Sequence, residues 1–155
     1  MVGEGPEIAH IDLVIGPKGS YVEQAFVSAL ASPAKGHTPL LAVLAPNLPA
    51  KPFTLMVNKV TIKGAGQAML IFGPAQAAVA KAVMDCVAEG TLPQELADEL
   101  MIIVSLFIEW DAKDKKKIYE YNYQATKMAI ERAVDRNPRV AEILAKKDSA
   151  KHPFA

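Results

Sequence analysis

A histidine and an aspartate two positions apart are the first residues of this chain whose types and spacing suggest chemistry. His10 and Asp12 lie in the stretch 9–17, AHIDLVIGP. Side chains alternate along a strand, so Ile11, Leu13 and Ile15 would face a core while His10 and Asp12 share the opposite face. A strand that only had to fill a core would not carry two ionisable groups in this arrangement.

Such a pair could move a proton. Histidine is the side chain whose ordinary pKa lies nearest neutral pH, so it serves as a general acid or base. A carboxylate on the same face favours the protonated imidazole and can orient a polar ligand. His-x-Asp on a strand is a weak signal by itself, however, and a purely structural polar pair remains the alternative.

Four further residues are candidates for a site. Lys59 and Thr61 share one face of the strand predicted over residues 54–63, where they could equally be solvated strand residues. Gln76 lies early in a predicted helix and is also an ordinary residue for that position. Leu41 belongs to an apolar run and, from the pattern alone, is a core residue.

Apolar periodicity predicts the helices and strands that position these residues, and Gly and Pro predict the turns between them. Ser20 and Glu23 have the spacing of a capping box, and Asp111 or Asp114 can cap a long helix. Three prolines over 46–52 predict a stiff loop, and Pro74 predicts the first turn of a helix. Strands are predicted at 7–15, 40–44, 54–63 and 101–110, and helices at 20–31, 74–90, 93–100, 111–136 and 138–147.

Interleaved strands and helices of this kind predict an α/β (α+β) two-layer sandwich, a mixed sheet with helices on one face. The 155 residues suffice for a single domain with its own core. The open face of the sheet would then hold a ligand or a partner, with His10, Asp12, Lys59 and Thr61 as candidates to lie on it.

Composition excludes several classes of function. The chain has 17 basic and 17 acidic residues, whereas nucleic-acid binding needs a basic excess. Cys86 is the single cysteine and is expected to be a buried helix residue. No run of the roughly 20 apolar residues needed for a membrane span and no signal peptide is evident, so we expect a cytoplasmic protein. The three histidines, His10, His37 and His152, are too scattered for a metal site, and His37 is expected to be exposed in its loop.

The chain resembles the formaldehyde-activating enzyme family of methylotrophic bacteria and methanogenic archaea. The matching segments occur in the same order over nearly the whole chain, which is more specific than any one motif. They are AHIDL (9–13), IGP (15–17), LAV (41–43), APNLP (45–49), KP (51–52), TLM (54–56), NKVTI (58–62), FGPAQ (72–76), VAEG (87–90), YNY (121–123), ATK (125–127) and HPFA (152–155).

This resemblance implies a fold similar to domain 2 of ribosomal protein S5 and a homopentamer. It also implies condensation of formaldehyde with tetrahydromethanopterin to 5,10-methylene-tetrahydromethanopterin and water, with no metal or prosthetic group. The family places the pterin in a cleft between subunits. Its proposed general acid falls on His10, and its pterin-lining residues fall on Asp12, Leu41, Lys59, Thr61 and Gln76.

A non-catalytic relative that binds the pterin or senses formaldehyde is the alternative function. Such a copy could keep the fold and most of the site. The retained His10 favours the enzyme, because loss of the acid would be the simplest way to lose turnover.

Overall fold

The computed structural model describes residues 1–151, so the terminal segment HPFA quoted above lies outside the described residues. In chain order the helices and strands are η1 (Gly5–Glu7), β1 (His10–Pro17), α1 (Tyr21–Ala31), β2 (Leu40–Leu41), β3 (Val43–Ala45), β4 (Leu48–Pro49), β5 (Phe53–Asn58), α2 (Ala65–Leu70), η2 (Ile71–Ala75), α3 (Gln76–Ala88), η3 (Gln94–Leu96), β6 (Leu100–Phe107), α4 (Lys115–Asp135) and α5 (Val140–Lys146).

Four strands form one mixed sheet in the order β1-β6-β5-β2. The central strand β6 runs antiparallel to β1, from His10 opposite Phe107 to Pro17 opposite Leu100, and parallel to β5. Strand β2 pairs antiparallel with β5 at the other edge, and β3 and β4 form a separate hairpin. The predicted mixed sheet is thereby confirmed.

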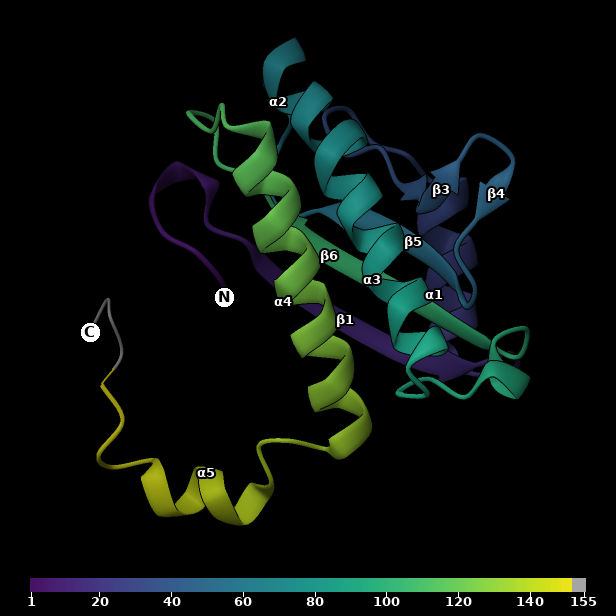
Figure 1. The fold of residues 1–155 in the computed structure, drawn as a ribbon, viewed down its shortest axis with the longest axis vertical. Helices are drawn as coiled ribbons and strands as arrows, with labels where there is room; N and C mark the ends of the chain where they lie inside the picture. Colours follow the sequence, from purple (N-terminus) through teal and green to yellow (C-terminus); the bar gives the residue numbers. More distant parts are fainter. Residues whose placement is uncertain (152–155) are drawn as a thin grey trace.

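The main core lies between the sheet and the helices α3 and α4, which run across one face (Figure 1). Ile11 of β1 and Ile102, Val104 and Leu106 of β6 point into this core, as strand alternation predicts. Cys86 of α3 is fully buried there, also as predicted, and burial raises the pKa of its thiol to about 11. The two-layer sandwich is confirmed.

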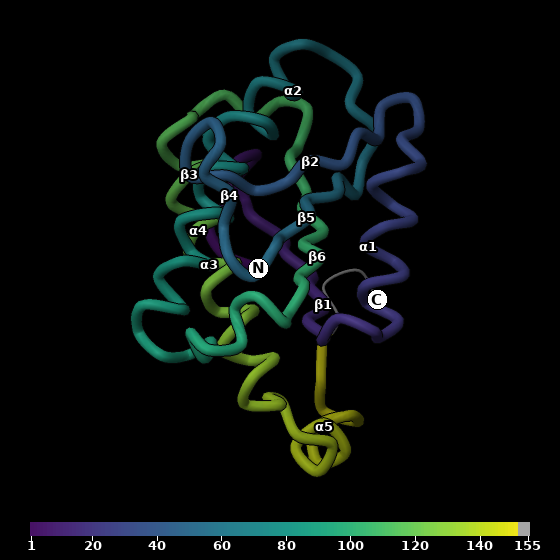
Figure 2. The backbone as a smooth tube through the Cα atoms, turned by 90° about the vertical axis from the view of Figure 1, so that its right-hand side faces the viewer, coloured from purple at the N-terminus to yellow at the C-terminus, as the bar shows by residue number. Residues whose placement is uncertain are grey.

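Helix α1 departs from the prediction of helices on one face only. Figure 2 shows α1 on one side of the strands with α3 and α4 on the other. Phe26 of α1, 4% exposed, packs on Leu55 and Met101, whose side chains project from the second face of the sheet. The second face is therefore covered over part of its area, and the rest, which includes His10 and Asp12, stays open.

One long helix replaces the helix predicted to start at Pro74. Helix α2 runs through the π-helical turn η2 into α3, so the backbone is continuously helical over Ala65–Ala88. The wider π turn accommodates the ring of Pro74, which an α-helical interior would not. At the helix start, the buried Gln67 accepts from the Lys63 N–H and donates to the Ile108 carbonyl.

By length and composition alone, the helix Ala65–Ala88 could cross a membrane. However, 56% of its most apolar window is buried inside the molecule. The core helix of a soluble protein passes the same test, so this is weak evidence for a membrane protein.

Several predicted boundaries also move. Strand β1 begins at His10, because residues 5–7 form the 3₁₀ turn η1. The run 40–44 is divided between β2 and β3, and β5 ends at Asn58 rather than at residue 63. The helix predicted over 93–100 is the single turn η3, after which β6 begins at Leu100.

The predicted caps are present. The Ser20 hydroxyl accepts from the Val22 N–H and so caps α1. Glu23 reaches back to the Gly19 N–H instead of the Ser20 N–H, so the reciprocal capping box is not formed as predicted. Asp114 caps α4 by accepting from the N–H groups of Lys116 and Lys117.

Candidate functional site

His10 and Asp12 lie side by side on the open face of the sheet, as the alternation along β1 predicts. Their ring and carboxylate are joined by a 3.4 Å contact between His10 Nε2 and Asp12 Oδ1. That distance suits an ion pair when the ring is protonated, but it is long for a hydrogen bond. The His10 side chain is 45% exposed, so a small molecule in solution can reach the ring.

Lys59 joins these two residues from the other side of β6. Its backbone N–H donates to the Leu106 carbonyl at 2.8 Å, which extends the β5–β6 pairing one residue past β5. Its side chain crosses toward β1 and its Nζ contacts Asp12 Oδ2. The register places Ser105 between Asp12 and Val57, and this small side chain leaves room for the crossing.

The Asp12 carboxylate therefore lies between the Lys59 ammonium on one oxygen and the His10 ring on the other. The hydrogen bond from Lys59 holds the pKa of Asp12 below its ordinary value, against the opposing effect of partial burial. The charges of Lys59 and His10 act in the same direction. Asp12 therefore stays ionised near neutral pH and holds a negative charge beside the His10 ring.

Thr61 lies beyond the end of β5, so the prediction that it shares a strand face with Lys59 is wrong. The chain leaves the sheet after Asn58, and other contacts hold this segment. The Thr61 carbonyl accepts from Trp110 Nε1 at 3.2 Å, and its hydroxyl lies 3.1 Å from His37 Nε2. Thr61 remains exposed, two residues along the chain from Lys59.

His37 is the residue of this region to which the sequence assigned no role. It is half-buried rather than exposed, and its ring bridges the Thr61 hydroxyl and the Asn58 carbonyl. No sequence signal marks this contact, because residues 37 and 61 belong to different loops and only the fold brings them together.

Leu41 and Gln76 form a second group. Gln76, only 7% exposed, donates from Nε2 to the Leu41 carbonyl at 3.4 Å. This contact ties the start of α3 to the edge strand β2. Leu41 packs beside the cluster of Phe26, Leu55 and Met101 and is partly buried.

The two groups lie at opposite edges of the sheet. His10 and Asp12 are on β1 and Leu41 is on β2, with β6 and β5 between them. Three strand spacings amount to about 14 Å. The structure thus brings together His10, Asp12 and Lys59, and separately Leu41 and Gln76, while Thr61 follows the first group along the chain.

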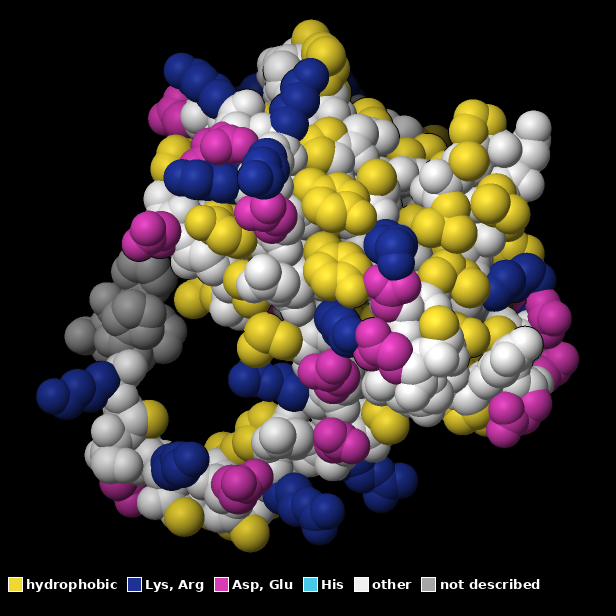
Figure 3. Space-filling view, in the orientation of Figure 1, with side chains coloured by type: hydrophobic (Ala, Val, Ile, Leu, Met, Phe, Trp, Pro, Cys, Tyr) yellow, Lys and Arg dark blue, Asp and Glu magenta, His cyan; other side chains and the backbone are white. Residues whose placement is uncertain are grey.

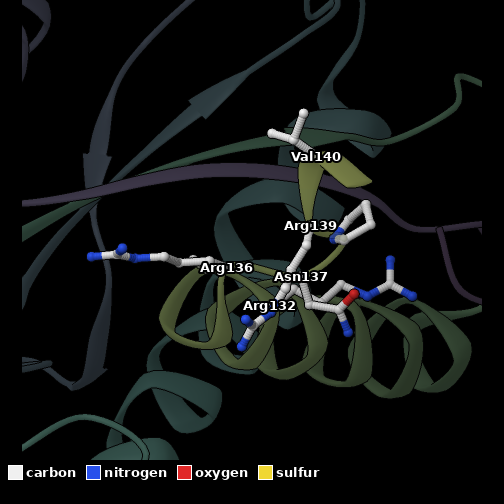
Figure 4. A pocket seen from close by; sticks show the side chains of 7 residues that line it. Arg132, Arg136, Asn137, Arg139 and Val140 are labelled. Atoms are coloured by element: carbon white, nitrogen blue, oxygen red, sulfur yellow. The ribbon is translucent and has the colours of Figure 1, made fainter. Parts of the chain in front are cut away.

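A more voluminous cleft lies elsewhere among the described residues. It measures about 540 Å³ at the junction of α4 and α5 and is lined by Arg132, Arg136 and Arg139. Figure 4 shows the guanidinium groups pointing in different directions, so they do not converge on one anion. The helical face of the molecule mixes acidic and basic side chains around apolar ones (Figure 3).

Over residues 1–151, no group of three or more His, Cys, Asp or Glu side chains is arranged to hold a metal ion. The residues predicted for the site are instead a mixture of one imidazole, one carboxylate, one ammonium, one hydroxyl, one amide and one aliphatic side chain. Such a set suits an organic ligand with several polar atoms and an apolar ring face.

The whole chain, residues 1–155, matches the family described as Formaldehyde-activating enzyme (Fae). A 5,6,7,8-tetrahydromethanopterin hydro-lyase of Methanosarcina barkeri is 69% identical over 155 residues, which is all of this chain and 87% of that protein.

Longer relatives share the same region. A protein named Bifunctional enzyme Fae/Hps from Archaeoglobus fulgidus is 57% identical over 99% of this chain, and another from Methanothrix thermoacetophila is 56% identical. The chain spans 39% of the length of each of these two proteins. From the match over its full length, we conclude that the chain belongs to the formaldehyde-activating enzyme family.

Proposed function

We propose that this protein condenses formaldehyde with tetrahydromethanopterin to give 5,10-methylene-tetrahydromethanopterin and water. The name of the M. barkeri relative supports the reaction and its pterin substrate. The structural observation that carries the proposal is the row His10–Asp12–Lys59 on the open face, where a proton donor is paired with a carboxylate that is held ionised.

His10 is proposed as the general acid. One pterin amine adds to the carbonyl carbon of formaldehyde and forms a carbinolamine. Protonated His10 then gives its proton to the hydroxyl group, which leaves as water and creates an iminium. The second amine attacks the iminium carbon and loses a proton, which restores protonated His10. General acid catalysis of this kind contributes about 10²- to 10⁴-fold.

The other residues are proposed to bind and orient the pterin. Asp12 stabilises the imidazolium of His10 and, being 65% exposed, has an oxygen surface within reach of a ligand. Lys59 and Thr61 would contact the polar edge of the pterin, Leu41 its ring face, and Gln76 a further polar atom. Holding both amines beside one small aldehyde also removes an orientation cost.

A site shared between subunits is the natural extension of this proposal. The predicted pterin residues are divided between the β1 and β2 edges of one chain, so a single copy presents two partial surfaces. A neighbouring copy that places its β2 edge near the β1 edge of the first would join them. We therefore propose that the pterin binds between subunits. The number of subunits, five, is proposed from the family resemblance and not from this geometry. We also propose that the protein is located in the cytoplasm, with no permanently bound cofactor and no nucleic-acid or membrane partner.

The test is the rate at which methylene-tetrahydromethanopterin forms from formaldehyde, measured against the spontaneous reaction. We expect the protein to accelerate it. If the protein binds the pterin without accelerating its condensation, the non-catalytic alternative holds. Light scattering of the protein in solution tests the pentamer, and a monomer would contradict the shared site.

A further inference from the structure

His37 contacts Thr61, one of the residues proposed to bind the pterin. The other contact of the His37 ring determines which of the two residues donates in this hydrogen bond. His37 Nδ1 lies 3.2 Å from the Asn58 carbonyl oxygen, and Nε2 lies 3.1 Å from Thr61 Oγ1. A carbonyl oxygen only accepts, so this bond requires the proton on Nδ1. Asn58 Nδ2 also lies 3.4 Å from Nδ1, but its two protons go to the Gly36 and Val60 carbonyls, so it does not compete as a donor. In the neutral ring, Nε2 is then an acceptor, and the Thr61 hydroxyl donates to it.

We propose that His37 is a positioning residue that makes Thr61 a hydrogen-bond acceptor toward the substrate. A hydroxyl group has a single proton, and His37 takes it. The exposed side of Thr61 therefore presents only oxygen lone pairs. It selects a ligand group that donates, such as a ring N–H or the exocyclic amino group of the pterin, and disfavours a group that only accepts. This inference rests on the proposed function, in which Thr61 contacts the pterin.

The surrounding backbone keeps the ring in place. The Gly36 carbonyl accepts from Asn58 Nδ2 at 2.8 Å and from the Ile62 N–H at 2.9 Å. Backbone bonds between Ala34 and His37 close the loop in both directions. Gly36 has a φ of +75°, and a Cβ there would lie 2.5 Å from Thr61 Cγ2, so only glycine lets the two loops approach this closely.

The His37 ring also faces the same side of the sheet as the proposed acid. A small cleft of about 140 Å³ is lined by His37, Asn58 and Val57, among others. Val57 is level with Ser105, which is level with Asp12, so these three side chains project from one face. His37 thus stands behind Thr61 on the face that carries His10 and Asp12.

Two substitutions separate the two bonds of the ring. The amide of His37→Asn reaches the position of Nδ1 and keeps a donor for the Asn58 carbonyl, but it is too short for Thr61. The longer amide of His37→Gln reaches the position of Nε2, where its oxygen accepts from the Thr61 hydroxyl. Lys35→Gln, at an exposed position of the same loop, is the matched control.

We expect His37→Asn to raise the KM for tetrahydromethanopterin about 3- to 10-fold, the value of one hydrogen bond, with kcat within about twofold. His37→Gln and Lys35→Gln should stay within about twofold of wild type in both constants. Thr61→Val should raise KM as much as His37→Asn does, and adding His37→Asn to Thr61→Val should change nothing further.

Three results would overturn the inference while the proposed function stands. The first is an equal effect of His37→Asn and His37→Gln on KM, and the second is a fall in kcat at constant KM. The third is an effect of His37→Asn on KM that adds to the effect of Thr61→Val. Long-range ¹⁵N–¹H NMR of the ring adds a test that needs no activity: the proton is expected on Nδ1, and a proton on Nε2 of the neutral ring overturns the inference. If wild type binds the pterin without turnover, the proposed function fails, and pterin Kd values of the same variants decide the inference. A wild-type protein that does not bind the pterin overturns both.

Discussion

Asn58 holds the loop that carries Lys59 and Thr61, and its isosteric replacement Asn58→Asp tests this directly. The Asn58 side chain is 9% exposed, and its Nδ2 donates to the carbonyls of Gly36 at 2.8 Å and Val60 at 2.5 Å. A carboxylate cannot donate, so both bonds are lost. At about 1 kcal/mol each, plus the cost of a buried charge facing carbonyl oxygens, we expect a loss of about 2–4 kcal/mol in the free energy of unfolding.

The effect should depend on pH in a defined direction. Burial and the two carbonyl oxygens disfavour the ionised form of the introduced carboxyl, whereas the Nδ1–H of His37, 3.4 Å from the Asn58 amide nitrogen, favours it. We expect the first two effects to be larger, so its pKa in the folded protein lies above the unfolded value of about 3.9. The destabilisation is therefore full above the folded pKa and shrinks as the pH falls toward the unfolded one. Urea unfolding at neutral and acidic pH measures both the size and the trend.

Asn47→Asp provides the matched control, because Asn47 is exposed and carries the same change of charge. It should alter the free energy of unfolding by less than about 0.5 kcal/mol. A loss below 0.5 kcal/mol for Asn58→Asp, or a loss that does not shrink on acidification, would refute the role given to the Asn58 side chain.

Three more predictions concern the site, the second face of the sheet and the N-terminal segment. Lys59→Met should lower the free energy of unfolding by less than about 1 kcal/mol, because its partner Asp12 is 65% exposed. The same substitution should raise the pterin KM several-fold. If urea unfolding shows that the free energy of unfolding falls by more than about 2 kcal/mol, the role of Lys59 is structural instead. Phe26→Ala should lower the free energy of unfolding by about 3–5 kcal/mol, because it leaves a cavity between α1 and the sheet. A loss below about 1 kcal/mol would mean that α1 is not packed there. Glu7 accepts from two backbone N–H groups before α4, which lowers its pKa. Glu7→Gln should therefore lower the free energy of unfolding by about 1 kcal/mol at pH 7 and leave it unchanged below the folded pKa of Glu7. A loss of unfolding free energy that does not depend on pH would contradict this.

The features that the sequence predicts correctly are those set by local chemistry. Alternation along β1 places His10 and Asp12 opposite the core, because a strand has a strict period of two. Ser20 and Asp114 begin their helices because a side-chain oxygen satisfies N–H groups that no helical partner can reach. These interactions span a few residues, so the sequence pattern contains the information.

What the sequence does not predict depends on contacts between distant segments. Pro74 lies inside a helix because the π turn and the core around it accommodate the ring, whereas the local rule places it at a helix start. Strand β5 stops at Asn58 because the Asn58 side chain and the Ile62 N–H bond to the Gly36 carbonyl, which holds the following segment against the loop of residues 34–37. His37 gains its place from the same long-range contact, and Leu41 and Gln76 meet only because α3 crosses the β2 edge.

His10 is proposed to supply the proton for loss of water, and a kinetic comparison of His10 variants distinguishes this role from pterin binding. Formation of methylene-tetrahydromethanopterin would be followed at saturating pterin for wild type, His10→Ala and His10→Gln, each corrected for the spontaneous rate. We expect kcat to fall about 10²- to 10⁴-fold in both variants, while pterin Kd stays within about threefold. If either variant turns over as fast as wild type with the pterin bound, His10 is not the general acid.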